Sequence, residues 1–151
     1  MMKRDYETHQ PIVECLLSDN GKLPYRAHET DAGGDLYSAV NITLNPGDVE
    51  LIDTGVAVKI PKGYMGQIFN RSSQGIRGIT IPHSVGIIDA TYRGQLKVLL
   101  RNDGNDPYEI KRGETRIAQL VISPIVLPKF VDIWNDTERG TGGFGSTGAT
   151  A

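Results

Sequence analysis

Residues Gly86 to Leu96, G-I-I-D-A-T-Y-R-G-Q-L, place three reactive side chains close together in the chain. Asp89 supplies a carboxylate, Tyr92 a phenol and Arg93 a guanidinium. The preceding apolar run would normally continue as a strand, so a bend at Asp89 with a glycine at each end is compatible with a catalytic or binding site. On its own the segment is more simply a hairpin, because Asp and Gly are residues that turns require.

A second group of polar residues could bind a metal ion. Asp31 and Asp35 lie on either side of Gly33-Gly34. Two such carboxylates could hold hydrated Mg²⁺, a hard ion that proteins bind through one or two carboxylates together with substrate phosphates. A polar turn ahead of a strand explains the same residues equally well.

A third group could bind phosphate. The segment Asn70-Arg71-Ser72-Ser73-Gln74-Gly75, called the phosphate seat below, follows a strand-like run and would begin a short helix. Backbone N–H groups at a helix start, with two hydroxyls and a guanidinium, are good ligands for phosphate. The simpler explanation for the segment alone is a serine N-cap beside a surface arginine.

Two polar residues interrupt a later apolar strand. Arg116 and Gln119 lie in a run that is otherwise apolar and continues to Ile122. Polar side chains at such positions must face solvent or form hydrogen bonds, so a structural network and a ligand contact both remain open.

The C-terminal tail, Glu138 to Gly148, matches G-x-G-x-x-G at Gly140, Gly142 and Gly145. The dinucleotide-binding interpretation of this motif is rejected, because the motif must follow a strand and open a helix, whereas only six residues follow Gly145. A flexible tail would require neither Arg139 nor Phe144. The segment could instead close over a ligand, with Arg139 on phosphate and Phe144 on a flat ring.

Composition limits the classes of protein that need be considered. The chain has 151 residues, enough for one domain with its own core, and a net charge of −2 without a basic run that would indicate a nucleic-acid surface. Its single cysteine, Cys15, is best explained as a small core residue of a protein in a reducing compartment. No apolar segment approaches the ~20 residues of a membrane span, so we expect a cytoplasmic protein, in the host cell if the source is viral.

The elements that carry these residues should be almost entirely strands. The 18 glycines separate short apolar segments, as in all-β domains. Three segments alternate with a period of two residues and should share one core. Their apolar positions are Val40, Ile42 and Leu44; Val56, Val58 and Ile60; and Leu96, Val98 and Leu100. We expect one or two helical turns after Arg71, and Pro124 and Pro128 should exclude a central strand from the chain's end.

In order and spacing, five segments of the chain resemble the five motifs of the trimeric dUTP diphosphatase (dUTPase) family. They are Asp31–Ala39, Arg71–Gly75, Gly86–Leu96, Arg116–Leu120 and Arg139–Gly148. Each alone is a weak signal, but the complete set spans most of the chain and is highly specific.

The resemblance implies an all-β, jelly-roll-like fold with very little helix. It implies a homotrimer with three active sites, each built from all three subunits, in which the C-terminal tail is exchanged. Residues 1–135 would form the β-domain and residues 136–151 a flexible, Gly-rich arm that closes over the site. The partners would be dUTP and the other two subunits, with no nucleic acid and no membrane.

The resemblance also implies the reaction. The enzyme would hydrolyse dUTP to dUMP and pyrophosphate, with Mg²⁺ on the triphosphate, keeping uracil out of DNA and supplying dUMP for thymidylate synthesis. Asp89 would be the general base for water attacking the α-phosphorus in line. Tyr92 would pack under the deoxyribose and exclude a 2′-hydroxyl. Asp35 would hold Mg²⁺ through water, with Asp31 as a helper.

The remaining implied contacts are with the base and the phosphates. The backbone around Ser84, Gly86 and Ile88 would read the uracil edge. The α- and β-phosphates would contact Arg71, Ser72, Ser73 and Gln119. Arg139, Ser146 and Thr147 would bind the γ-phosphate, Phe144 would cover the base, and Gly145 would be a further substrate contact.

The chain departs from the family pattern at supporting positions. His83 replaces a common asparagine, Ser73 a glycine, Gln74 an apolar residue, and Gly34 an aromatic or aliphatic one. Two alternatives remain: a dCTP deaminase, whose phosphate segment also contains Arg-Ser-Ser, and a non-catalytic trimer that senses nucleotides. The absence of a glutamate from the Asp89 segment argues against the first, and retention of Asp89 and the tail against the second.

Overall fold

The computed structural model describes residues 10–143, and those residues form strands, turns and one helical turn. The elements in order are β1 (Glu14–Leu17), β2 (Gly33–Tyr37), β3 (Ile42–Leu44), β4 (Val49–Lys59), β5 (Tyr64–Phe69), α1 (Ser72–Gly75), β6 (Ile79–Thr80), β7 (Gly86–Ile88), β8 (Gln95–Asn102), β9 (Tyr108–Ile110) and β10 (Arg116–Pro124). The predicted all-β, jelly-roll-like class with very little helix is confirmed.

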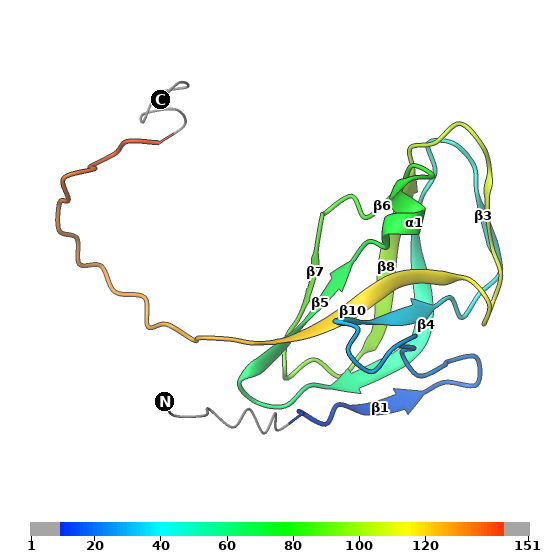
Figure 1. Cartoon of the computed structure of the whole chain (residues 1–151), viewed down its shortest axis with the longest axis horizontal. Helices are drawn as coiled ribbons and strands as arrows, with labels where there is room; N and C mark the ends of the chain where they lie inside the picture. The colour runs from blue at the N-terminus through cyan, green and yellow to red at the C-terminus, as the bar shows by residue number, and fades with distance from the viewer. Residues whose placement is uncertain (1–9, 144–151) are drawn as a thin grey trace, which may run out of the picture.

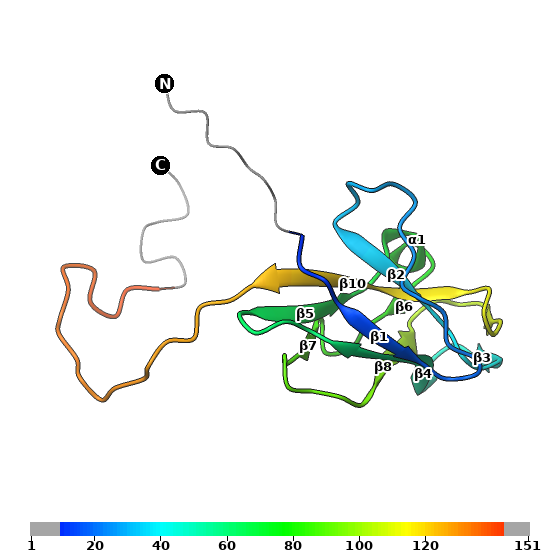
Figure 2. The ribbon, with the colours of Figure 1, turned by 90° about the horizontal axis from the view of Figure 1, so that it is seen from below.

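Two four-stranded antiparallel sheets make up the body of the molecule (Figures 1 and 2). Sheet A has the strand order β1-β4-β8-β6 and sheet B the order β2-β10-β5-β7, while β3 and β9 pair separately. In sheet B, β10 therefore lies between β2 and β5, although it is the last strand in the sequence. The polar residues of β10 consequently lie beside segments from much earlier in the chain.

The core lies between the two sheets and contains the side chains that alternation predicted. Sheet A contributes Val56, Val58, Leu96, Val98 and Leu100, and sheet B contributes Leu36, Ile68, Ile117 and Leu120. Successive side chains of a strand point to opposite faces, so every second residue of β8 is buried while its neighbours are half-buried or exposed. The three alternating segments share one core as predicted, with Val40 and Ile42 at its edge.

The chain changes character after β10. This strand reaches Pro124, two residues beyond the apolar run that ends at Ile122, and proline closes it as the last residue. Residues 125–143 then extend away from the two sheets in both views (Figures 1 and 2). Their large apolar side chains are exposed, including Phe130 and Trp134. Within residues 10–143, no helix is long and apolar enough to cross a bilayer.

Candidate functional site

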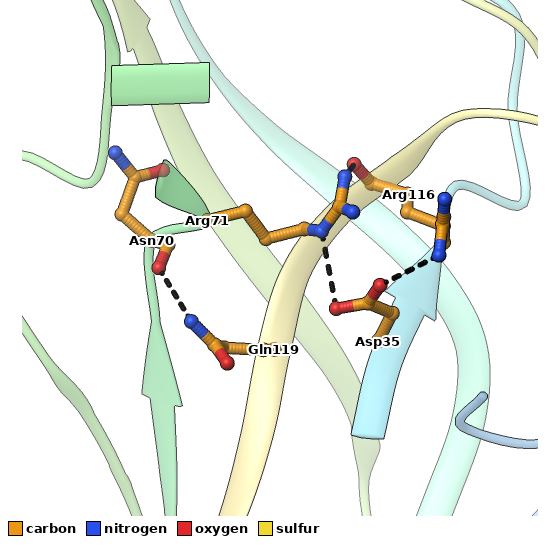
Figure 3. A network of polar contacts seen from close by, with 5 residues as sticks. All are labelled: Asp35, Asn70, Arg71, Arg116 and Gln119. Carbon is orange, nitrogen blue, oxygen red and sulfur yellow. Dashed lines mark hydrogen bonds and ion pairs between the residues drawn. The ribbon is translucent and has the colours of Figure 1, made fainter. Parts of the chain in front are cut away.

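A carboxylate between two arginines forms the best-defined polar cluster (Figure 3). Asp35 on β2 accepts from Arg71 Nε at 3.1 Å through one oxygen and from Arg116 Nη1 at 3.0 Å through the other. The Asp35 and Arg71 side chains are only 18% and 21% exposed, so solvent screens this pair less than a surface ion pair. We call Asp35, Arg71 and Arg116 the Asp35 cluster. It joins three of the sequence-predicted segments within one subunit.

A β-bulge in β10 explains how Arg116 reaches Asp35. Residues three apart on a regular strand point to opposite faces, so Arg116 and Gln119 should have diverged. The register with β2 shifts between Arg116 and Ala118, which pair with Tyr37 and Leu36, and Gln119 then lies opposite Asp35. Both polar side chains are thereby brought to the Asp35 side of the sheet.

Gln119 connects β10 to the phosphate seat. Its Nε2 donates to the backbone carbonyl of Asn70 at 2.9 Å, as Figure 3 shows. Gly33 leaves room for this side chain, since a Cβ there would lie 2.6 Å from Gln119 Oε1. The structural role of Gln119 is therefore confirmed, and its contact with phosphate remains a prediction.

The phosphate seat forms one helical turn, as expected. Helix α1 begins at Ser72, and the residue that caps it is Arg71, in extended conformation and without a side-chain capping bond. The simpler explanation, a serine N-cap, is wrong, because both serines lie inside the turn. Ser72 and Ser73 are exposed, so their hydroxyls are accessible to a ligand.

Within the turn, Gln74 is buried and has no polar partner among residues 10–143. Its side chain is 2% exposed, and neither Oε1 nor Nε2 has a hydrogen-bond partner among residues 10–143. Asn70, four residues earlier, donates through Nδ2 to the Ile79 carbonyl at 2.8 Å, while its Oδ1 is also buried and unpaired within the same residues. The departure at Gln74 thus puts an amide where apolar atoms would cost less free energy.

The Asp89 hairpin begins with β7, the edge strand of sheet B opposite β2. Strand β7 pairs with β5 in the register Gly66↔Ile88 and Ile68↔Gly86, and Asp89 follows it directly. Asp89 is exposed, and with Tyr92 it lines a cavity of about 250 Å³ together with Ile87, Ile88, Leu96 and Lys97. A carboxylate on an exposed turn beside a small cavity can accept a proton from a bound water molecule.

The turn after Asp89 is closed by its own side chains. The Tyr92 N–H donates to the Asp89 carbonyl at 3.0 Å, and the Tyr92 hydroxyl donates to the Gln95 carbonyl at 3.1 Å. Arg93 Nη1 donates to the carbonyls of Ala90 at 2.7 Å and Tyr92 at 2.9 Å. Sequence reasoning assigned no role to Arg93, because backbone carbonyls as partners leave no signal in residue types.

The segment before β7 has a strained backbone. Ser84 is the only residue other than glycine within 10–143 with a positive φ, at 68°. Such a conformation costs free energy for a residue with a Cβ and occurs often at functional sites. The neighbouring His83 is exposed, with Nε2 3.5 Å from where a Cβ on Gly86 would lie. The departure at His83 therefore places an imidazole beside the start of the hairpin.

One departure from the family pattern has a local cause. Gly34 is buried, and a Cβ at this position would lie 2.9 Å from the Cβ of Pro24. Pro24 thus occupies the space that a side chain on residue 34 would need.

A single chain does not bring all the candidate residues together. β2 and β7 are opposite edges of sheet B, so three strand spacings, or about 14 Å, separate the strand of Asp35 from the strand before Asp89. Arg139 lies on the extended segment, where its Nε donates to the Gly142 carbonyl at 3.0 Å. Phe144, Gly145, Ser146 and Thr147 lie outside the described residues.

Two ionisable groups outside these clusters have shifted pKa values. Burial raises the pKa of the Cys15 thiol, which packs against the core as expected for a small apolar residue. A hydrogen bond from Arg101 lowers the pKa of Asp103, with a second from Thr80. Neither group lies in the candidate site.

Comparisons with known proteins agree on one family. A family model described as dUTPase matches residues 19–148. The deoxyuridine 5'-triphosphate nucleotidohydrolase of Corynebacterium diphtheriae is 42% identical over 151 residues, covering 97% of this chain and 99% of that protein. Its namesake from Mycolicibacterium gilvum is 47% identical over 149 residues, covering 93% and 96%.

Solved structures give the same result. The dUTPase of Staphylococcus bacteriophage 80alpha with dUPNHPP matches at a TM-score of 0.79 and 37% identity, covering 91% of this chain and 98% of that one. A mutant of the dUTPase from phage phi11 of S. aureus, described as coordinating a structural Mg(II) ion, matches at a TM-score of 0.75 and 32% identity, covering 82% and 97%.

Proposed function

This chain belongs to the dUTPase family, and from that premise we propose how its own residues hydrolyse dUTP to dUMP and pyrophosphate. The family match over residues 19–148 carries the assignment. The reaction asks a protein chiefly to position the triphosphate, neutralise its charge and deliver water to the α-phosphorus. Exposed residues of the phosphate seat could position the triphosphate and neutralise its charge, and the exposed Asp89 hairpin could deliver the water.

We propose that Asp89 is the general base. It would take a proton from a water molecule whose oxygen attacks the α-phosphorus in line, as the bond from that phosphorus to the bridging oxygen breaks and pyrophosphate leaves. The carboxylate is exposed beside a cavity of about 250 Å³, so water can reach it. Tyr92, which lines the same cavity, would pack under the deoxyribose and exclude a ribose 2′-hydroxyl.

Arg71, Ser72, Ser73 and Gln119 would hold the α- and β-phosphates. In the Asp35 cluster, two guanidinium groups share one carboxylate, which leaves a net positive charge beside the exposed hydroxyls of α1. That charge would attract a polyphosphate. Arg139 with Ser146 and Thr147 would bind the γ-phosphate, Phe144 would cover the base and Gly145 would contact the substrate, so that residues 136–151 act as a closing arm beside the β-domain of residues 1–135.

We propose that Mg²⁺ binds the triphosphate and contacts the protein through water held by Asp35. Each Asp35 oxygen accepts one bond from an arginine, and an ionised carboxylate has about four acceptor sites, so sites remain for water. Among residues 10–143, no three His, Cys, Asp or Glu side chains gather to hold a metal ion, which fits an ion carried mainly by substrate phosphates. When bound, it would neutralise charge on the phosphates.

We further propose that the site is completed in a homotrimer. Asp35 lies on β2 and Asp89 comes directly after β7, and these two strands are the opposite edges of sheet B. Residues 125–143 extend away from the sheets with apolar side chains exposed. Both observations support a site shared between subunits, in which one chain gives the hairpin, a second the phosphate seat and a third the arm.

The substrate assignment is tested by incubating the protein and Mg²⁺ separately with dUTP, UTP, dTTP and dCTP. Pyrophosphate should form rapidly from dUTP and poorly from the other three. Failure to release pyrophosphate from dUTP would overturn the assignment, and ammonia from dCTP would identify a deaminase instead. Sedimentation at the same protein concentration measures the number of subunits.

A further inference from the structure

Arg93 has no place in the chemistry above, yet its guanidinium is bonded to the backbone of the Asp89 hairpin on both sides of Thr91. We propose that Arg93 is a positioning residue for sugar discrimination, which holds the backbone of Ala90 to Tyr92 so that the Tyr92 ring excludes a 2′-hydroxyl. This inference rests on the proposed function, because it concerns how the same hairpin distinguishes dUTP from UTP.

One nitrogen of Arg93 makes both bonds, which together we call the Arg93 clamp. A single nitrogen, Arg93 Nη1, carries two protons and donates to the Ala90 carbonyl at 2.7 Å and the Tyr92 carbonyl at 2.9 Å. These carbonyls lie on either side of Thr91, so both peptide planes are held by one group. Hydrogen bonds from a charged donor are stronger than neutral ones.

The Tyr92 ring is held at its tip by a separate hydrogen bond. Its hydroxyl donates to the Gln95 carbonyl at 3.1 Å, and a Cβ on Gly94 would lie 2.6 Å from Tyr92 Cζ. The ring therefore lies against Gly94, with its tip bonded to the next strand. The other end of the residue, its backbone carbonyl, accepts the bond from Arg93 at 2.9 Å.

Arg93 lies near a carboxylate with which it does not pair. It lines a surface cavity of about 360 Å³ together with Glu14 and Lys59, which pair with each other at 2.9 Å. Within residues 10–143, Arg93 forms no ion pair with Glu14 or with any other carboxylate. A surface arginine beside an acidic residue would commonly pair with it. Here its hydrogen bonds go to its own turn.

Loss of the Arg93 clamp should change the discrimination between dUTP and UTP more than it changes the binding of dUTP. Excluding one hydroxyl requires the ring to stay close to the sugar, and a displacement of about 1 Å is enough to change rates severely. Releasing the clamp should admit UTP more readily while dUTP still fits. The two substrates should therefore respond differently, which a general loss of stability would not produce.

The test compares Arg93→Met, which keeps the apolar stem, with Arg93→Lys, which keeps a charged donor on a shorter side chain. Arg112→Met is the matched control, because Arg112 is exposed on the β9–β10 connection and its side chain makes no hydrogen bond within residues 10–143. For each variant, kcat/KM is measured with dUTP and with UTP from pyrophosphate release, alongside far-ultraviolet circular dichroism and sedimentation.

The ratio of kcat/KM for dUTP to that for UTP should fall about ten-fold in Arg93→Met, which corresponds to about 1.4 kcal/mol. Arg93→Lys should restore part of the ratio, and Arg112→Met should leave it unchanged. An unchanged ratio in folded Arg93→Met, including a parallel loss with both substrates, would overturn the proposal. Should Arg93→Met fail to fold, an unchanged ratio in Arg93→Lys would overturn it equally. Lack of pyrophosphate from dUTP with the unaltered chain would instead overturn the proposed function on which it rests.

Discussion

Replacing Gln74 by leucine should stabilise the protein, against the usual outcome of a buried substitution. Gln74 is 2% exposed, and both polar atoms of its amide lie buried without a partner among residues 10–143. A buried polar group without a hydrogen bond costs about 1–3 kcal/mol by mutational measurement. Leucine has a similar shape and no polar atoms to desolvate.

The size of the effect follows from two opposing contributions. Removing the unpaired amide should gain about 1–3 kcal/mol, while fitting a branched side chain into a packed space costs up to about 1.5 kcal/mol. A net stabilisation of about 1 kcal/mol is therefore expected. Asn70 Oδ1, which has no partner among residues 10–143, is not altered by this substitution, so its own cost is unchanged.

The assay is denaturant unfolding at one fixed protomer concentration, because association shifts apparent stability. Gln67→Leu is the matched control. Gln67 is half-buried on β5, and its Oε1 accepts from Ser123 Oγ at 2.9 Å, so the same substitution removes a satisfied hydrogen bond. The control should lose about 1 kcal/mol. Destabilisation of Gln74→Leu by as much as the control would refute the reasoning, since it would mean that the Gln74 amide has a polar partner.

Three further predictions test the proposed site. Asp89→Asn should bind a non-hydrolysable dUTP analogue normally and lose about 10²–10⁴-fold in kcat, and normal turnover would remove Asp89 from the mechanism. Truncation before Arg139 should leave a folded protein with poor catalysis, as judged by circular dichroism and pyrophosphate release; full activity would show that the arm is dispensable. Asp35→Asn should lower the free energy of unfolding by about 1–3 kcal/mol, because it weakens the hydrogen bonds from Arg71 and Arg116 and leaves these partly buried arginines without a counter-charge; unaltered stability and Mg²⁺ dependence would contradict both roles of Asp35.

The strands and the core could be predicted because each depends on a local pattern. Alternation placed Val56, Val58 and Leu100 on buried faces, and the structure confirms them. The short helical turn expected after Arg71 is also present, at Ser72–Gly75. The residue that caps this turn could not be predicted, because Arg71 occupies the cap position with an extended backbone and makes no capping bond through its side chain.

The Asp35 cluster could not be predicted from residue types. Arg116 and Gln119 are three residues apart, and a regular strand would have sent them to opposite faces. Only the bulge at Arg116/Ala118 brings both to Asp35, and a bulge depends on pairing with a distant strand. The Arg93 clamp could not be predicted from residue types either, because its partners are carbonyls that every residue has.

The central place of β10 has a consequence for how the chain folds. Arg116 and Asp35 are 81 residues apart in sequence, and their contact requires the last strand to insert between β2 and β5. Closing such a long loop lowers the entropy of the chain before the contacts that stabilise it can form. Sheets built from strands far apart in sequence therefore fold slowly. During synthesis, β2 and β5 are complete well before β10, and their facing edges remain without the strand that separates them. The Asp35 cluster and the bond from Gln119 to Asn70 therefore cannot be completed until β10 has been made and has inserted between β2 and β5.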